Sequence, residues 1–185
     1  KKGALLFYGT SITQGGVASR PGMCFVNILG RRLDRPILNF GFSGNGKMEP
    51  SVGRFLAELD PAIFVIDCVG NSSLEDITEH TEPLVKMLRT AQTSSAILLL
   101  ERPLFPTEGL CKHPGNDVPA KNAALRKAYE NLRAAGTSKL YYRIGNGLIG
   151  NDGEATVDGS HPSDLGMMRY ADGLEPTLRE ILASN

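Results

Sequence analysis

The chain has 185 residues, of which 41% are hydrophobic and 22% are charged, and its 20 basic and 20 acidic residues give a formal net charge of zero. This length and composition fit a single globular domain over residues 1–185 and exclude a disordered chain. The balanced charge gives no electrostatic footprint for nucleic acid or an anionic membrane, and no apolar run approaches the roughly 20 residues of a transmembrane helix. We therefore expect a small, neutral or modestly polar ligand, with no nucleic acid and no membrane insertion.

The three cysteines, Cys24, Cys68 and Cys111, are an odd number and lack CxxC spacing. This pattern predicts neither a disulfide framework nor a zinc site, and buried thiols are the simplest interpretation. No pair of histidines or carboxylates has convincing metal-ligand spacing, so we expect no metal and no cofactor. The chain begins with Lys1 and Lys2 directly before an apolar run, which we interpret as a domain excised from a longer protein.

The first apolar run begins at Leu5 and leads into a turn rich in Gly, Ser and Thr, Gly9 to Gly16. This pattern is typical of a buried parallel strand that delivers a side chain, here Ser11, to the edge of a sheet. Further strands are predicted at 36–40, 62–69, 96–101 and 139–144. The last of these is shorter and more polar, as expected for an edge strand.

Helical spacing of apolar residues predicts helices between these strands. Their expected ranges are 23–33, 51–59, about 74 or 77 to 91, 121–135 and 165 to about 183. Pro83 predicts a later start or a kink in the third helix, and Pro176 a kink or split in the last. The segment 102–119, with four prolines and two glycines, is predicted to be a long loop over the sheet edge.

Strands that alternate with helices of this length predict a three-layer α/β/α sandwich around a five-stranded parallel sheet. In such sheets ligands bind beyond the carboxyl ends of the strands. The loops after the first three strands, together with the last loop, should therefore meet at one rim.

Ser11 lies at this rim, and a serine becomes nucleophilic only when a base takes its proton. His161 is the candidate base because Asp158 precedes it by three residues. On one compact turn, the Asp158 carboxylate could accept a hydrogen bond from Nδ1 of His161 and leave Nε2 free for the serine hydroxyl. Taken singly, Ser11 is an ordinary turn serine or helix cap and His161 a surface loop histidine, so only their combination favours catalysis.

Acyl transfer also needs hydrogen-bond donors for the oxyanion. The candidates are the backbone N–H groups of Ser11 and Gly44 and the side-chain amide of Asn71, because Gly44 and Asn71 each follow a predicted buried strand. Each also has a structural interpretation, Gly44 as a tight-turn residue and Asn71 as a loop or cap residue. The glycines from 41 to 46 lack the spacing of a dinucleotide-binding loop, so phosphate binding is not indicated.

Ser11, Gly44, Asn71 and the sequence Asp158-Gly159-Ser160-His161 occur in the order that defines the SGNH/GDSL hydrolase superfamily, which the chain resembles over essentially its whole length. The resemblance implies a flavodoxin-like SGNH hydrolase fold and a metal-free esterase. In it Ser11 is the nucleophile, His161 the base and Asp158 its orienting partner, while Ser11, Gly44 and Asn71 form the oxyanion hole. Two departures are Thr10 in place of the aspartate of Gly-Asp-Ser, and Ser72 in place of the aspartate of Gly-x-Asn-Asp.

The expected activity is hydrolysis of a short-chain acyl ester, because the few aromatic residues favour a short acyl group such as acetate. The resemblance favours O-acetyl groups on a carbohydrate as the substrate. The resemblance also suggests an upstream β-sandwich domain and an extracellular or periplasmic location. Two alternatives stay open. One is an acyltransferase that uses the same acyl-enzyme, and the other is a non-catalytic carbohydrate-binding or interaction domain with the same fold.

Overall fold

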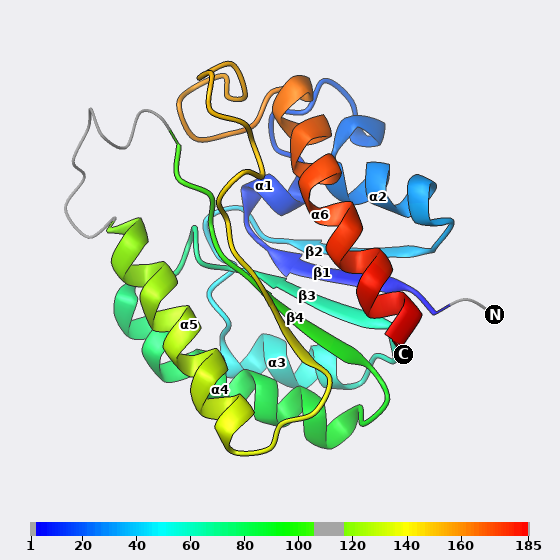
Figure 1. The fold of residues 1–185 in the computed structure, drawn as a ribbon, viewed down its shortest axis with the longest axis vertical. Helices are drawn as coiled ribbons and strands as arrows, with labels where there is room; N and C mark the ends of the chain where they lie inside the picture. The colour runs from blue at the N-terminus through cyan, green and yellow to red at the C-terminus, as the bar shows by residue number, and fades with distance from the viewer. Residues whose placement is uncertain (1–2, 106–116, 185) are drawn as a thin grey trace.

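The computed structural model describes residues 3–105 and 117–184. The chain alternates strands and helices, as its apolar runs predict (Figure 1). The elements are β1 (Leu5–Gly9), α1 (Ser11–Gln14), η1 (Pro21–Met23), α2 (Phe25–Leu33), β2 (Ile37–Gly41), α3 (Pro50–Ala57), β3 (Ile63–Asp67), α4 (Leu74–Ala91), β4 (Ala96–Leu100), α5 (Val118–Ala134), β5 (Leu140–Arg143) and α6 (Asp164–Ser184). Within the described residues, no helix combines the length and apolarity needed to cross a bilayer.

The five strands form one sheet in the order β2-β1-β3-β4-β5, and every neighbouring pair is parallel. This confirms the predicted five-stranded parallel sheet and the edge position of β5. The chain moves from β1 to one side of the sheet and then returns to the other side at β3. The strand order therefore reverses beside β1, and ligand sites in open α/β sheets form at such a switch point, beyond the carboxyl ends of the strands.

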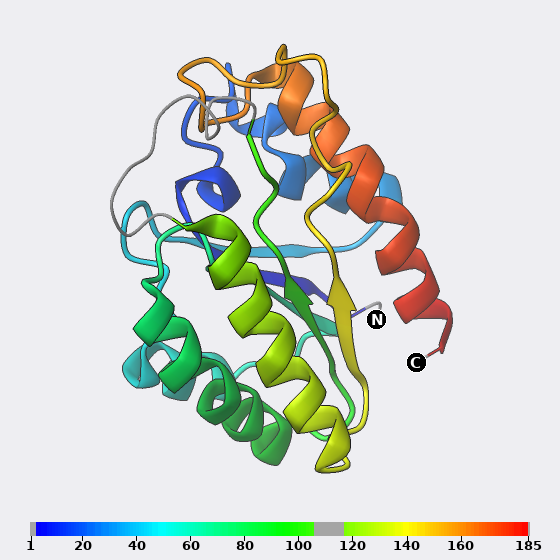
Figure 2. The ribbon, with the colours of Figure 1, turned by 60° about the vertical axis from the view of Figure 1, so that its left-hand side comes forward.

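Helices cover both faces of the sheet, which gives the predicted three layers (Figures 1 and 2). One face packs against α2 and α6, with Phe7, Phe25 and Tyr170 buried between the layers. The other face packs against α3, α4 and α5, and its core includes Tyr8 and Phe64. Because both faces are covered, β1, β3 and β4 are buried along their whole length, and burial of these apolar side chains is the main driving force for the fold.

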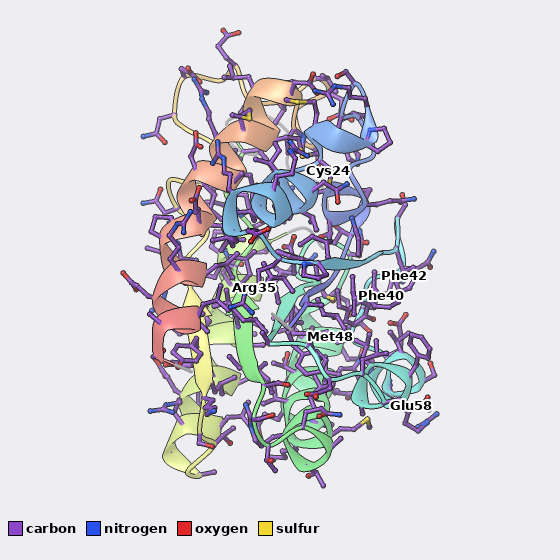
Figure 3. The ribbon with its side chains drawn as sticks, turned by 90° about the vertical axis from the view of Figure 1, so that its right-hand side faces the viewer. Cys24, Arg35, Phe40, Phe42, Met48 and Glu58 are labelled. Atoms are coloured by element: carbon purple, nitrogen blue, oxygen red, sulfur yellow. The ribbon has the colours of Figure 1, made fainter. Side chains whose placement is uncertain are left out.

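The outer strand β2 is only partly covered. Phe40 and Phe42 lie at this edge, on the side of the sheet that α3 covers (Figure 3). The Phe40 ring packs edge-to-face against Phe55 of α3, and the Phe42 ring packs in the same way against Tyr8 of β1. These aromatic contacts fix the end of β2 from which the next loop leaves the sheet.

The later start predicted for the third helix, the split predicted for the last helix and the predicted end of the long loop were wrong. Helix α4 starts at Leu74 and continues through Pro83, and α6 likewise runs through Pro176 as one helix. Helix α5 begins at Val118, so the loop predicted to reach residue 119 ends earlier. Pro119 lies in the first turn of α5, where a missing N–H costs nothing, and the Asp117 side chain caps that turn. Most of that loop, residues 106–116, lies outside the described residues.

Cys24 and Cys68 are buried free thiols, as predicted. Cys24 lies where α2 begins (Figure 3), and its Sγ contacts the backbone oxygen of Thr13 at 3.3 Å. Burial raises the pKa of both thiols, which keeps them protonated. Cys111 lies outside the described residues.

Candidate active site

Ser11 is the first residue of α1, the one-turn helix that follows β1. Thr10 is the N-cap of this helix: its side-chain oxygen accepts a hydrogen bond from the backbone N–H of Ile12 at 3.2 Å. The Thr13 side chain in turn accepts from the backbone N–H of Thr10 at 3.3 Å, which completes a capping box. Threonine and aspartate are both good N-cap residues, so Thr10 can replace the family's usual aspartate without loss of the cap.

Asp158 and His161 lie on a compact turn just before α6. The turn is closed by an antiparallel bridge between Thr156 and Pro162 and by a hydrogen bond from the N–H of Val157 to the carbonyl oxygen of His161. Its apex is Gly159, whose φ of 85° a side chain would disfavour. Figures 1 and 2 show the segment that leads into α6 above α1, although the two are far apart in the sequence.

The structure brings Ser11, His161 and Asp158 together in one hydrogen-bonded chain. Oγ of Ser11 lies 2.9 Å from Nε2 of His161, and Nδ1 of His161 lies 2.6 Å from Oδ2 of Asp158. The carboxylate can accept a hydrogen bond from Nδ1 only if Nδ1 carries a hydrogen. In a neutral imidazole this leaves Nε2 as the acceptor for the serine hydroxyl. The site is open to solvent, because 33% of the His161 side-chain surface is exposed.

Asp158 is held as a carboxylate. Its partial burial opposes ionisation, but hydrogen bonds from the backbone N–H and the imidazole of His161 and from the N–H of Ser160 outweigh that cost. Together they lower the pKa of Asp158 to about 2. A general base becomes an imidazolium during proton transfer, and a carboxylate beside it stabilises that transient charge.

The two remaining predicted residues lie on loops after β2 and β3. Gly44 has a φ of 73°, and the turn around it is closed by hydrogen bonds from the N–H groups of Asn45 and Gly46 to the carbonyl oxygen of Phe42. Oδ1 of Asn71 accepts from the N–H of Gly46 at 3.4 Å. This contact joins the two loops and leaves the NH₂ of Asn71 pointing away from Gly46.

Three donors at this site make no hydrogen bond to another described residue. They are the backbone N–H groups of Ser11 and Gly44 and the side-chain NH₂ of Asn71. Gly44 is exposed, whereas Ser11 and Asn71 are half-buried, so the three donors are available for hydrogen bonds to the oxygen atom of a bound ligand.

Two polar residues at this site were not predicted from the sequence. Thr13 and Asp67 are both buried, and Oγ1 of Thr13 donates to Oδ2 of Asp67 at 2.8 Å. The available signal was Asp67 itself, a charged residue that follows four apolar residues at the end of a buried strand. Among the described residues, no group of three or more His, Cys, Asp and Glu side chains is arranged to hold a metal ion.

Comparison with solved structures finds proteins that share the fold of this chain. A protein described as a GDSL-like lipase from Bacteroides ovatus is 36% identical, with a TM-score of 0.94 over 98% of this chain. A salicylyl-acyltransferase from a tetracycline biosynthetic pathway is 17% identical, with a TM-score of 0.84 over 98% of this chain. A family two carbohydrate esterase from Clostridium thermocellum, 17% identical, has a TM-score of 0.74 over 99% of this chain.

The chain spans 54%, 55% and 66% of the lengths of these three proteins. The two likenesses at 17% identity concern the fold alone. A search of curated proteins found no match.

The model of the GDSL-like Lipase/Acylhydrolase family matches residues 2–179, which is nearly the whole chain. The match agrees with the parallel sheet and with the serine, histidine and aspartate side chains that meet at its carboxyl edge. The chain therefore belongs to the GDSL-like lipase/acylhydrolase (SGNH) family of carboxylic ester hydrolases.

Proposed function

We propose that this chain hydrolyses short-chain acyl esters through Ser11, His161 and Asp158, and that O-acetyl groups on a carbohydrate are its substrate. The observation that carries the proposal is the continuous hydrogen-bonded chain from Asp158 through His161 to Oγ of Ser11. Its geometry matches the requirement for a nucleophile, a base within reach and a third group that orients the base.

In the first step, Nε2 of His161 takes the proton of Ser11 as Oγ attacks the ester carbonyl carbon. The C=O bond becomes a single bond to an oxyanion, which accepts hydrogen bonds from the N–H groups of Ser11 and Gly44 and from the NH₂ of Asn71. The oxyanion then re-forms the carbonyl, the ester C–O bond breaks, and His161 returns the proton to the leaving alcohol. The product of this half-reaction is an acyl-enzyme on Ser11.

In the second step, His161 takes a proton from water as the water attacks the acyl carbon. Collapse of the second oxyanion breaks the bond to Oγ, and the serine regains its proton from His161. Throughout, Asp158 stays ionised, in keeping with its low pKa, and stabilises the imidazolium. The product acid leaves as a carboxylate.

A short acyl group and a carbohydrate are supported by different observations. The described loops near Ser11 include small and polar residues, such as Gly44, Asn45 and Asn71, which suit a short acyl group. The Clostridium thermocellum structure is named as a carbohydrate esterase, and it shares the fold of this chain.

Acyl transfer to an alcohol other than water is the second candidate function. The structural likeness to a salicylyl-acyltransferase favours it, because that protein has the same fold with a TM-score of 0.84. The solvent-exposed edge of His161 leaves room for an acceptor alcohol in place of water. Product analysis with and without added acceptor alcohols separates the two activities.

The test is hydrolysis of p-nitrophenyl acetate, butyrate and octanoate by the wild type and Ser11→Ala, with fluorophosphonate labelling in parallel. We expect fastest turnover of the acetate, and loss of both turnover and labelling in Ser11→Ala. Ser94→Ala is the matched control, because Ser94 is an exposed serine at the opposite, amino end of β4. Acetate release from an acetylated xylan then tests the carbohydrate substrate. A folded wild type that neither hydrolyses nor labels would instead support a non-catalytic binding domain.

A further inference from the structure

Asp67 carries a buried carboxyl group that the mechanism above does not use. It is the last residue of β3, lies opposite Gly9 of β1 in the sheet register, and is only 5% exposed. Burial of a carboxylate is costly unless hydrogen bonds and charges compensate it, and an apolar residue would pack the same space at no such cost. The partners of Asp67 therefore indicate what it does.

Its first partner belongs to the helix that carries the nucleophile. Oγ1 of Thr13 in α1 donates to Oδ2 of Asp67 at 2.8 Å. Oγ1 of Thr13 also accepts a hydrogen bond from the N–H of Thr10 at 3.3 Å. The hydroxyl lies directly against β1, since a Cβ built on Gly9 would be 2.1 Å from it. Gly9 and Thr13 thus allow α1 to pack closely against the carboxyl end of β1 and β3. Ser11 lies two residues before Thr13, which makes this contact.

Its second partner belongs to the helix that follows the histidine turn. The hydroxyl of Tyr170 in α6 makes a long hydrogen bond of 3.5 Å to Oδ1 of Asp67. Tyr170 is 1% exposed, and its ring lies 4.4 Å from that of Phe25, so its hydroxyl has little freedom to move. Helix α6 begins three residues after His161, and its position therefore sets the position of the imidazole.

We propose that Asp67 is a positioning residue for the esterase reaction, because its two oxygens hold α1 through Thr13 and α6 through Tyr170. The bridge keeps Oγ of Ser11 within hydrogen-bond distance of Nε2 of His161, two atoms contributed by segments 150 residues apart. Asp67 does not touch the substrate. This inference rests on the proposed function, because it assigns a role in the same reaction.

The charged and titratable groups around Asp67 are consistent with a bridge. Desolvation raises the pKa of Asp67 to about 7, while the hydrogen bonds from Thr13 and Tyr170 and the positive charge of Arg102, just after β4, act in the opposite direction. Cys68, the next residue in the chain, stays a neutral thiol because burial and the nearby Asp67 raise its pKa. Tyr170 likewise stays a phenol and can donate its proton, because burial raises its pKa.

The test compares Thr13→Val, Thr13→Ser, Tyr170→Phe and Asp67→Asn in the full chain. For each variant kcat and KM for p-nitrophenyl acetate, the rate of fluorophosphonate labelling and the melting temperature are measured. We expect Thr13→Val to lower kcat about 10- to 100-fold with KM changed less than about threefold, because a misplaced nucleophile affects chemistry rather than binding. Thr13→Ser keeps the hydroxyl and should stay within about threefold of wild type.

Ser95→Ala is the matched control, since Ser95 is also a buried hydroxyl but lies at the amino end of β4 and donates to the carbonyl oxygen of Pro61 at 2.6 Å. We expect it to lower the melting temperature and leave kcat unchanged. If Thr13→Val, Tyr170→Phe and Asp67→Asn behave like Ser95→Ala, with lower melting temperatures and kcat within about twofold of wild type, Asp67 is only structural and the inference is overturned. An inert, folded wild type would instead overturn the proposed function, and the inference with it.

Discussion

His161 binds Asp158 at two atoms: its backbone N–H donates to Oδ1 at 2.7 Å and its Nδ1 lies 2.6 Å from Oδ2. The N–H of Ser160 adds a further bond to Oδ1 at 2.9 Å. One oxygen of the carboxylate therefore shapes the turn, while the other orients the imidazole. The two functions of Asp158 can be separated by mutation.

Asp158→Asn should keep the turn and lose most of the activity. The asparagine oxygen can still accept from the backbone N–H groups, but its NH₂ would donate to Nδ1 and favour the imidazole tautomer that cannot accept the serine proton. We expect kcat for p-nitrophenyl acetate to fall roughly 10²- to 10⁴-fold. Asp152→Asn is the control, because Asp152 is similarly exposed, also has a pKa of about 2, and pairs with Arg169 instead of a histidine. Equal loss in both variants would contradict the assignment.

Asn71→Ala should lower kcat about 10²- to 10³-fold, with little change in KM, because an oxyanion donor acts on the transition state and not on bound ester. Asn71→Asp keeps the oxygen that accepts from Gly46 but has no NH₂ and carries a negative charge, so it should be at least as slow. Asn131→Ala, at an exposed site whose NH₂ binds Glu82, should match wild type. Steady-state kinetics on p-nitrophenyl acetate measure all three, and an active Asn71→Asp would exclude the donor role.

Alanine substitutions at Gly44 and Gly46 should both destabilise the protein, but for different physical reasons. A Cβ at Gly46 would be 2.1 Å from the carbonyl oxygen of Gly9, so the loop must move away from β1, at a cost of roughly 1–3 kcal/mol. A Cβ at Gly44 meets no atom within 4 Å, and only the positive φ opposes it, by about 1–2 kcal/mol. Urea denaturation measures both costs. We expect Gly46→Ala to lower activity as well, because the displaced loop carries the N–H of Gly44; wild-type activity in a destabilised Gly46→Ala would argue against that donor.

Asp67 should make the protein less stable as the pH rises from about 4 to about 7. In this range the folded protein keeps a proton on Asp67, whose pKa is raised to about 7, whereas the unfolded chain has lost it. The free energy of unfolding therefore falls with rising pH by roughly 1.4 kcal/mol for each pH unit over which the two states differ by one proton. Asp67→Asn should flatten this part of the curve. Urea denaturation of both proteins from pH 4 to pH 8 measures the difference, and parallel curves would contradict it.

Most of the fold could be predicted because the strands are nearly continuous apolar runs bounded by glycine and proline. The elements that could not be predicted depend on local features of a short helix and of a proline within a helix. Helix α1 has only four residues and is capped by Gly15, so its sequence could not be distinguished from a turn. Pro83 is exposed on α4, and that helix is secured by the capping box of Ser73 and Asp76 at its start, so one missing hydrogen bond does not break it.

Part of the candidate site could likewise be predicted from the sequence, and part could not. Asp158 and His161 could be predicted as a pair because their spacing fixes their contact, and Ser11, Gly44 and Asn71 could be placed at one rim because parallel strands end there. The bridge from Thr13 to Tyr170 through Asp67 was beyond sequence reasoning. Its members come from α1, β3 and α6, and only the register of β1 with β3 and the packing of α6 bring them together.

The bridge between Thr156 and Pro162 gives the three candidate catalytic residues very different folding requirements. Closing so short a loop costs little chain entropy, and the contact between Asp158 and His161 joins residues only three apart in the sequence. Ser11 joins them from 150 residues away, and only once the sheet is assembled. If Ser11 is the nucleophile, as we propose, its covalent capture by a fluorophosphonate should therefore report on molecules in which the sheet has assembled.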